Sequence, residues 1–598
     1  MPSILICCGP DAPRRLDRLL PSLRHAEFGD LGRGSGDTRL LRREDLAVYV
    51  DGARSPGSPP DLDDDSGISE IAGVVLAFEG FLTHRAERGA ALRAALIEDF
   101  LAHGERCVER WRGSFRLVIA HGGVTRVFTD HTASRAVFVA EDAYGPLFAS
   151  HIAPLLAAIP QPSVNGASLL HFLRDGRFFA GTSLFREVRL LGPGRFRRIG
   201  PGRSPGDRAE TAWYRYHLEP QPQPQAAQVA DILPELKRRL DAAVLQHWRR
   251  ADAPALLLSG GYDSRYLLNT LASLVPHAAL RPLLTCLWGE PNPAPDCDAA
   301  WARREARRHG LVFEFTPLGA DLPGLFDAVF EAQSGMTAHV VTHTDDYARC
   351  RDLNHRGYRS LIRGDECFGP NGAPVRNLPE ALSRVGVNAL PRELPWLAPE
   401  APAEAWRAAH DARLRQLSEV ADDPNDVRDL LYYRERLPSV QAHLNAQRAP
   451  FVENHNPLLD ADVLDLVRRL PRELRADKGV FRLCFQRYFP TDGFADSGNA
   501  FDLGRLAREE APAGFLAERL DRLPFPFAPR YFGPLAARLR DAARGNGPVP
   551  SDGELRMVCR AVVIGHALDR AAAAAATAAT AATAMHPAST SRDRGQPE

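Results

Sequence analysis

The chain has 598 residues, which is too long to fold around a single hydrophobic core, so two or more domains are expected. Hydrophobic residues make up 44% of it and charged residues 25%, which is typical of globular proteins and not of disordered or fibrous ones. The formal net charge of -1 gives no electrostatic reason to expect nucleic acid or an anionic membrane as a partner.

The cysteines and the apolar segments indicate the compartment. Nine cysteines are scattered along the chain without a C-x-x-C pair, which argues against a disulfide framework and against a thiolate zinc site. The first residues, MPSILICCGPDAPRR, lack the basic segment and the cleavage site of a secretory signal. No apolar run is long enough to span a bilayer. We therefore expect a soluble cytoplasmic protein that does not bind a membrane.

The region up to residue 205 alternates strand and helix patterns. Its predicted strands are rich in β-branched and aromatic residues and lie at 71–80, 114–120, 125–130, 136–141 and 146–150. A helical pattern lies between them at 90–104. The stretch at 51–67, rich in Pro, Gly, Ser and Asp, is predicted to be an exposed loop. This mixture predicts a layered α+β domain over 1–205.

A segment rich in proline at 206–226 is predicted to link this domain to the next. After it, helices and strands alternate, and the expected elements lie at 229–248, 255–259, 264–275, 280–289 and 297–310. Strands that alternate with helices predict an α/β domain with a parallel sheet. Beyond about residue 375 the pattern is mostly helical, which gives a second domain over 227–570 with a helical extension. The low-complexity segment 571–598 is not expected to fold.

The sequence SGGYDS at 259–264 joins a predicted strand to a predicted helix. Such a loop presents free backbone N–H groups and the positive end of a helix dipole, which together suit a phosphate. Gly260 and Gly261 let the main chain approach phosphate oxygens closely, and the two serines add hydroxyl donors. Asp263 would repel phosphates unless a divalent cation lay between them, so it predicts Mg2+.

This loop resembles the S-G-G-x-D-S pyrophosphate loop (PP-loop) of ATP pyrophosphatases, and the chain around it resembles the asparagine synthetases. The other matching segments occur in the family's order, at 126–157, 183–199, 448–471 and 474–482. The likeness covers roughly residues 70–490. It implies an N-terminal Ntn-hydrolase-like αββα sandwich, as in class II glutamine amidotransferases, followed by a PP-loop domain that binds ATP.

The resemblance also implies a reaction and a set of site residues. ATP and Mg2+ would be used to convert a carboxylate to an acyl-adenylate, which an amine attacks to form an amide with release of AMP and pyrophosphate. The matched positions for the nucleotide are Leu258, Ser259, Gly260, Gly261, Asp263, Ser264, Arg363 and Gly364. Asp263 and Asp365 would coordinate the metal, and Lys478, one of only two lysines, would place its charge at the α-phosphate.

Several positions depart from the family pattern. Glutaminase activity needs a cysteine directly after the initiator methionine, because its free α-amine acts as the base, and here that residue is Pro2. We therefore expect a glutaminase fold without glutaminase activity. The family motif G-x-G-x-D-E reads LIRGDE before and at Asp365, and our hypothesis is that Arg363 replaces the lost backbone donors. Tyr262 and Arg265 stand where small or aliphatic residues are usual, and no effect is predicted for them.

Four further residues are candidates for the site. Glu366 adjoins the matched Asp365, and Arg482 is the arginine of the family's K-x-x-x-R segment. His339 and His343 occur in HVVTH on one face of a predicted helix, a spacing that suits two metal ligands or a base for the amine. Histidines at such a spacing more often have only a structural role.

The amine and the carboxylate stay open among three types of family member. Ammonia-using asparagine synthetases, β-lactam synthetases and lasso-peptide cyclases all work without glutamine. β-Lactam synthetases have a tyrosine three residues before the matching Asp, where this chain has Ile362. We favour the lasso-type cyclase, which joins the N-terminal amine of a peptide to an Asp or Glu side chain, with a leader peptidase as partner. Two other classes, a tRNA-modifying PP-loop enzyme and an inactive scaffold, are disfavoured by the neutral charge and by the retained motif.

Overall fold

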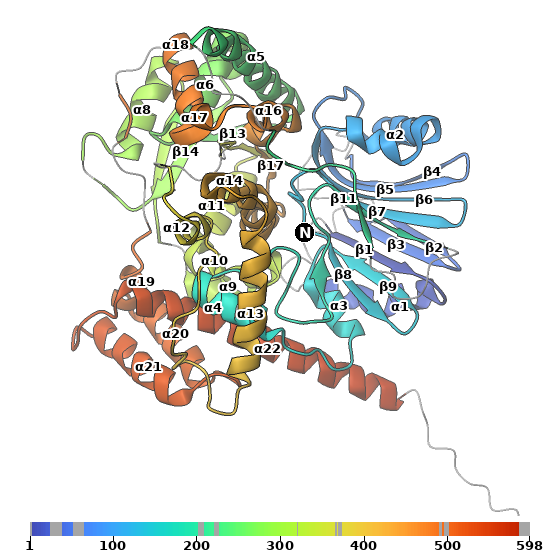
Figure 1. Ribbon diagram of the computed structural model, residues 1–598, viewed down its shortest axis with the longest axis vertical. Coiled ribbons are helices and arrows are strands. Elements are labelled where there is room, and N and C mark those ends of the chain that lie inside the picture. Colours follow the sequence, from blue (N-terminus) through green and yellow to red (C-terminus); the bar gives the residue numbers. More distant parts are fainter. Residues whose placement is uncertain are drawn as a thin grey trace, which may run out of the picture.

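The computed structural model describes residues 3–23, 39–51, 65–200, 209–219, 226–292, 294–319, 321–364, 367–368, 374–489, 493–495 and 501–584. It combines two antiparallel sheets in the N-terminal part, one parallel sheet in the C-terminal part and a group of helices at the C-terminal end (Figure 1). The fold is therefore mixed α/β, as predicted. No helix in these ranges is both long and apolar enough to cross a bilayer.

The N-terminal part contains two six-stranded sheets in which all neighbouring strands are antiparallel. The first has the order β10-β8-β9-β1-β3-β2 and consists of β1 (Ser3–Cys8), β2 (Arg39–Arg43), β3 (Leu46–Asp51), β8 (Phe138–Asp142), β9 (Gly145–Ala149) and β10 (Arg189–Leu190). The second has the order β12-β11-β7-β6-β5-β4 and consists of β4 (Gly67–Ile71), β5 (Val74–Leu82), β6 (Gly113–His121), β7 (Val124–Thr129), β11 (Arg195–Ile199) and β12 (Glu210–Ala212).

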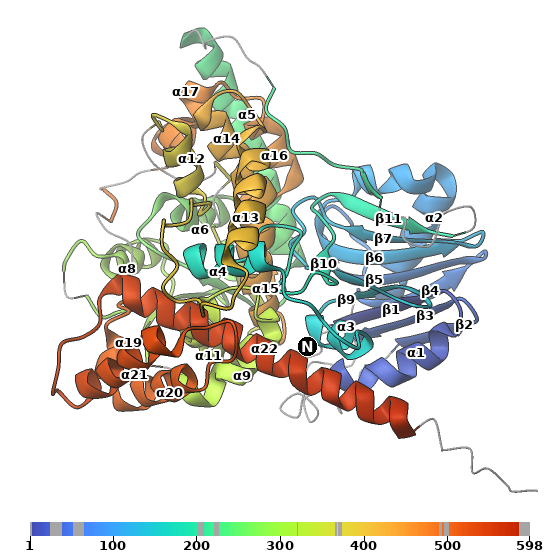
Figure 2. The same ribbon diagram turned by 60° about the horizontal axis from the view of Figure 1, so that its bottom comes forward.

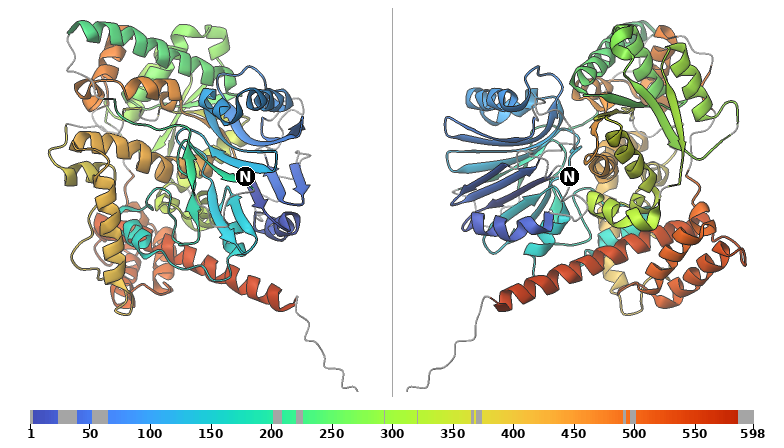
Figure 3. Two further views of the ribbon diagram at one scale, coloured as in Figure 1. Left: turned by 45° about the vertical axis from the view of Figure 1, so that its right-hand side comes forward. Right: turned by 180° about the vertical axis from the view of Figure 1, so that it is seen from behind.

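The two sheets are stacked face to face. Side chains alternate along a strand, so Ile4 and Ile6 of β1 point toward the second sheet, where they share a core with Val75 and Ala77 of β5. The outer faces are covered by α1 (Ala12–Leu19) and α3 (Ile152–Ala158) on the first sheet and by α2 (Gly89–His103) on the second (Figures 1 and 3). This is the αββα sandwich that the resemblance implied. β12 lies inside the segment predicted as linker, so the second sheet extends beyond residue 205.

A parallel sheet of five strands forms the centre of the second domain, in the order β15-β14-β13-β16-β17. Its strands are β13 (Pro254–Leu257), β14 (Leu284–Gly289), β15 (Phe313–Pro317), β16 (Ser360–Ile362) and β17 (Glu453–His455). The chain enters at β13, adds β14 and β15 on one side, and then adds β16 and β17 on the other. The order thus reverses between β13 and β16. In open sheets of this kind, ligands bind at the carboxyl ends of the strands at that switch point.

Helices surround this sheet and continue beyond it. They are α4 (Gly166–Asp175), α5 (Ala226–Arg250), α6 (Tyr262–Leu274), α7 (His277–Leu280), α8 (Asp298–Arg308), α9 (Leu322–Gln333), α10 (His339–Thr342), α11 (Thr344–His355), α12 (Leu378–Arg384), α13 (Ala403–Ser418), α14 (Pro424–Leu431), α15 (Ala442–Arg448), α16 (Ala461–Val467), α17 (Arg472–Arg475), α18 (Gly479–Tyr488), α19 (Arg505–Arg508), α20 (Glu510–Asp521), α21 (Pro529–Ala543) and α22 (Asp552–Ala584). A π-helix, Tyr432–Gln441, lies between α14 and α15.

The C-terminal tail differs from the prediction. The segment 571–584 was expected not to fold, but it continues α22 without a break. The reason is that alanine is the residue with the highest helix propensity, and the first of these alanines, Ala571, is buried against the rest of the protein. The remaining predicted tail, 585–598, lies outside the described residues.

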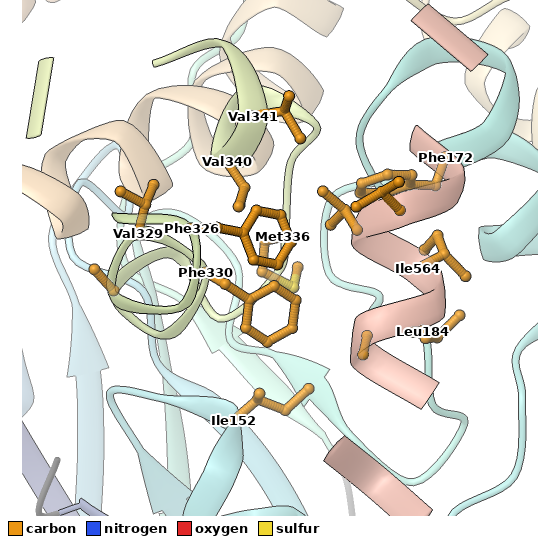
Figure 4. Close-up of a cluster of buried hydrophobic side chains, with 14 of the residues drawn as sticks. Ile152, Phe172, Leu184, Phe326, Val329, Phe330, Met336, Val340, Val341 and Ile564 are labelled. Atoms are coloured by element: carbon orange, nitrogen blue, oxygen red, sulfur yellow. The ribbon is translucent and has the colours of Figure 1, made fainter. Parts of the chain in front are cut away.

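A hydrophobic core joins the C-terminal helices to both domains. Figure 4 shows Phe326 and Phe330 of α9 beside Met336, with Ile564 of α22 across from them and Phe172 of α4 close by. Figure 2 shows α22 running along this region toward the first domain, and it contacts α3, α4 and α10. Helix α4 precedes the predicted linker, yet it packs against α13 of the second domain.

Buried polar residues also join the two domains. Arg135 lies between Glu79 of β5 and Glu453 of β17 and donates hydrogen bonds to both carboxylates. Nearby, the Nδ1 atoms of His247 and His455 are 3.2 Å apart. Burial, with a smaller contribution from His131, lowers the pKa of His247 to about 3, and burial also lowers the pKa of His455. Both imidazoles are therefore neutral at neutral pH.

Acid should therefore destabilise the protein through this interface. The unfolded state takes up protons below pH 6.5 that folded His247 does not accept, so the free energy of unfolding falls as the pH drops from 6.5 toward about 3. Between pH 7 and pH 5 this one histidine should lower the free energy of unfolding by about 2 kcal/mol. Urea unfolding of the wild type and of His247→Gln at both pH values measures it.

The variant should lose about 2 kcal/mol less than the wild type over this interval. The matched control is His355→Gln, because His355 is exposed on α11. An equal loss in the wild type and His247→Gln would show that the interface histidine is not responsible.

Candidate active site

The predicted phosphate loop lies at the switch point, between the end of β13 and the start of α6. The Ser259 N–H donates to Ser264 Oγ at 2.9 Å, and the two hydroxyl oxygens are 3.1 Å apart. The Gly260 N–H donates to Asp298 Oδ1 at 3.0 Å, and Gly261 is the N-cap of the helix. Two hydroxyls and the first N–H groups of a 13-residue helix are thus gathered at one point, which is an arrangement that suits an anion.

Leu258 has a different position from the other predicted nucleotide residues. Its side chain is completely buried in the core, and its N–H donates to Cys286 O at 2.9 Å. It therefore fixes the end of β13 and offers no side-chain contact to a ligand. Asp298, whose carboxylate holds Gly260, was not predicted, because nothing in its sequence context marks it.

Gly364 brings the loop that follows β16 onto the phosphate loop. A Cβ atom at Gly364 would lie 2.7 Å from Ser264 N and 2.8 Å from the carbonyl carbon of Asp263, closer than real Cβ contacts. Arg363 precedes it, and its N–H donates to His455 O at 2.9 Å, which continues the sheet for one more residue. The predicted residues on the two central strands therefore meet in space.

We expect Gly364→Ala to reduce ATP-dependent turnover by at least about 100-fold, because the added methyl group displaces the backbone of the phosphate loop. Initial rates of pyrophosphate release measure the effect. Gly514→Ala on α20 is the control, since a Cβ there meets nothing within 4 Å. Equal rates for the two variants would contradict the close contact.

Lys478 reaches the phosphate loop from the 3-10 turn Ala476–Lys478, directly before α18. Its ammonium group donates a hydrogen bond to Asp263 Oδ2, and the residue is only 4% exposed. Lys478 has a φ of 54°, a left-handed conformation that is uncommon outside glycine and often occurs at functional sites. The other lysine, Lys237, forms an ion pair with Asp241 on α5. Only one of the two lysines thus faces the loop.

These groups fit a nucleotide with magnesium. The hydroxyl and N–H donors suit phosphate oxygens, and the Asp263 carboxylate beside them suits a hard cation. Magnesium usually takes one or two protein carboxylates and completes its shell with phosphates and water, so a larger cluster is not required. Within the described ranges there is no group of three His, Cys, Asp or Glu side chains that could hold a metal. Asp365 and Glu366 lie outside the described residues, as does Pro2.

Arg265 has a clear structural role that the sequence did not reveal. It is completely buried, and its Nη2 and Nε atoms lie 2.9 and 3.1 Å from Glu305 Oε2. Its Nη1 donates to Gly493 O at 2.7 Å. It thereby fixes the segment 493–495, which we call the strap, next to the phosphate loop.

Two more contacts join the strap to the loop. The ring of Tyr262 stacks on Phe494 with 3.4 Å between the centroids, and the Ala495 N–H donates to Gly260 O at 3.4 Å. Both residues at which the motif departs from the family pattern thus hold the strap. Arg482 lies on the outer side of Tyr262, 5.2 Å from the ring centroid, and its guanidinium is paired with Asp477 at 2.8 Å.

His339 and His343 lie close together beside Arg363. Their ring centroids are 4.2 Å apart, and Thr342 Oγ1 lies 3.3 Å from His339 Nδ1 and 3.0 Å from His343 Nδ1. Burial and then the charge of Arg363 lower the pKa of His343 to about 4, and burial lowers that of His339. Both rings are neutral at pH 7. No third acidic, histidine or cysteine ligand joins them among the described residues, which gives a metal site no support.

The comparisons with known proteins identify the second domain. The family model of asparagine synthase matches residues 235–523. No curated protein matches the chain. Two solved structures that are similar are the allosteric regulatory enzyme of purine biosynthesis (10% identity, 54% of this chain and 81% of that chain, TM-score 0.23) and glutamine phosphoribosylpyrophosphate amidotransferase from B. subtilis with ADP and GMP (11%, 63% and 83%, 0.23). These TM-scores are too low to bear on this chain.

The matched range contains the phosphate loop, the loop after β16 and Lys478. A domain of this family supports ATP-dependent formation of amides. The geometry agrees, because the predicted phosphate loop lies at the switch point of a parallel sheet with a buried lysine against it. The chain therefore carries an asparagine synthase domain at residues 235–523.

Proposed function

We propose that the protein is an AMP-forming carboxylate–amine ligase that closes a macrolactam in a ribosomally made peptide. A side-chain carboxylate of the peptide is activated as an acyl-adenylate, and the N-terminal amine of the same peptide displaces AMP. The observation that carries the proposal is the asparagine synthase domain in a chain whose nine cysteines are all buried.

The buried thiols count against glutamine as the source of the amine. Releasing ammonia from glutamine in this family takes a nucleophilic thiol, and a thiolate is the reactive form. Cys7 and Cys8 lie within β1, in the core of the first domain, and burial raises the pKa of each thiol to about 12. The amine then has to be free ammonia or part of the substrate.

The site residues would share the work of activation. Ser259, Ser264 and the N–H groups of the loop would hold the phosphates that leave, and the buried ammonium of Lys478 would oppose the negative charge that develops there. Asp263 would hold Mg2+, which supplies further neutralisation of the phosphate charge when bound. The strap and Gly364 would fix the loop, because transfer of the adenylyl group needs the carboxylate oxygen and the α-phosphate to be aligned.

Product analysis with different substrates tests the proposal. ATP labelled at the α-phosphate is incubated with a precursor peptide that has a free N-terminus and an acidic residue, with aspartate plus ammonium, with aspartate plus glutamine, or with buffer alone. We expect AMP only with the peptide, together with a peptide product lighter by one water molecule. AMP and asparagine in the ammonium reaction would replace the proposal with an ammonia-using asparagine synthetase. No AMP with any substrate would overturn it.

A further inference from the structure

A cleft between the two domains carries an excess of positive charge. It has a volume of about 460 Å³, and its walls include five arginines, Arg189, Arg195, Arg215, Arg413 and Arg434. Two of them come from strands of the first domain, one from the connecting segment and two from helices of the second domain. Glu210 and Glu435 are the acidic residues of this lining, so the formal excess is three positive charges.

The acidic residues neutralise only part of the wall. Glu435 accepts from Arg413 at 2.9 Å and from the Ala180 N–H at 2.8 Å, so both of its oxygens are used. Glu210 lies 3.8 Å from Arg195. Arg434 donates to a backbone carbonyl, that of Tyr216, at 3.1 Å. Burial, and then the charges of Arg215 and Arg195, lower the pKa of Arg434, as expected where like charges gather.

The cleft is connected to the candidate active site. The π-helix Tyr432–Gln441 contributes one wall, and helices of this rare type often mark functional sites. Tyr433 lines the cleft, stacks on Tyr216 with 3.7 Å between the ring centroids, and donates its hydroxyl hydrogen bond to Cys367 O. Cys367 follows Asp365 by two residues, so one hydrogen bond joins the cleft to the loop after β16.

We propose that this arginine cleft binds an extended acidic segment of the peptide substrate, outside the residues that react. The guanidinium group of an arginine can bind a carboxylate with two parallel hydrogen bonds, and the rings of Tyr216 and Tyr433 provide surfaces for the rest of the segment. A phosphate ligand fits less well, because no α-helix begins in the described lining, whereas the candidate phosphate loop at Ser259 leads directly into the N-terminus of α6. The inference rests on the proposed function, since it names which part of the peptide is held and where.

Binding of short labelled peptides tests it without ATP. One fluorescein-labelled peptide carries several glutamates in a Gly and Ser background, and the other carries glutamines at the same positions. The wild type should bind the glutamate peptide about tenfold more tightly, and added salt should reduce the difference. The variant Arg195→Glu/Arg215→Glu should lose this preference. Both side chains are accessible, since Arg215 is exposed and the Arg195 side chain is 41% exposed, so the exchange leaves the core intact.

The matched control, Arg522→Glu/Arg556→Glu, reverses two exposed charges elsewhere, one directly after α20 and one on α22, and should keep the preference. Equal affinity for the two peptides, or an equal loss in the control, would overturn the proposal. The proposal would also be overturned if single-stranded oligothymidine bound more tightly than the glutamate peptide and the cleft variant lost this binding. A failure of the proposed ligase activity can be distinguished from a failure of this proposal, because the ligase test measures AMP release and this test measures peptide binding without ATP.

Discussion

Lys478→Ala is expected to lower the kcat for pyrophosphate release by about 1000-fold. The ammonium group is buried, donates to Asp263, and is the one lysine placed against the phosphate loop in the part of the chain that the structure describes. Its removal leaves Asp263 without a counter-charge and takes a cation from the phosphates. Steady-state rates at saturating ATP measure the loss, and thermal unfolding shows whether the variant is folded.

Two further variants sharpen this result. Lys237→Ala removes the only other lysine, which is paired with Asp241 on α5, and should keep the wild-type rate. Lys478→Arg keeps the positive charge but should recover little activity, because the planar guanidinium is larger and this position is buried. A kcat within tenfold of the wild type for Lys478→Ala would mean that another group opposes the phosphate charge.

Arg265→Met is expected to reduce the free energy of unfolding by about 3 kcal/mol, because it removes the closest positive charge from the buried carboxylate of Glu305. Burial alone would raise the pKa of Glu305, but hydrogen bonds from His309 and Asn269 and the charge of Arg265 lower it to about 2. The carboxylate thus stays charged, and losing the charge of Arg265 is costly at this buried position. Urea unfolding at pH 7 measures the change.

A double variant separates the role of Arg265 in folding from its role in the site. Arg265→Met/Glu305→Met removes both charges and should recover most of the stability, while the strap still lacks the bond to Gly493 O. The double variant should therefore be stable and have a raised KM for ATP. Arg522→Met is the control, because this arginine is in an exposed pair with Glu518 and should cost less than about 1 kcal/mol. An unchanged KM in the stable double variant would limit Arg265 to a structural role.

Local patterns in the sequence were enough to locate the centre of the candidate site. The run of apolar residues before Ser259 and the glycines after it predicted a strand, a turn and a helix, and the structure has β13 and α6 at those positions. The alternation of strands and helices also predicted the parallel sheet. Both predictions were possible because each element is determined by residues that are neighbours in sequence. The roles assigned to Asp365 and Glu366 stay predictions, since both lie outside the described residues.

Contacts between distant parts of the chain could not be predicted. Arg265 and Gly493 are far apart in sequence, and the motif marked Arg265 only as a departure. Helix α4 precedes the linker but packs on α13, where a Cβ atom at Gly166 would lie 2.0 Å from the ring of Trp406. The alanines of 571–584 were interpreted as low complexity, although the same composition favours a helix. In the first two cases the outcome depends on a neighbour that a single sequence does not reveal, whereas the helix at 571–584 follows from its own composition.

Exchange of labelled pyrophosphate into ATP tests the central claim most directly. The claim is that this phosphate loop activates a peptide carboxylate by adenylylation before any amine reacts. A precursor peptide with an acetylated N-terminus keeps the carboxylate but cannot cyclise. We predict that the wild type incorporates labelled pyrophosphate into ATP in the presence of this peptide, and that Lys478→Ala does not. Exchange that needs no peptide, or production of ADP and phosphate in place of exchange, would contradict the claim.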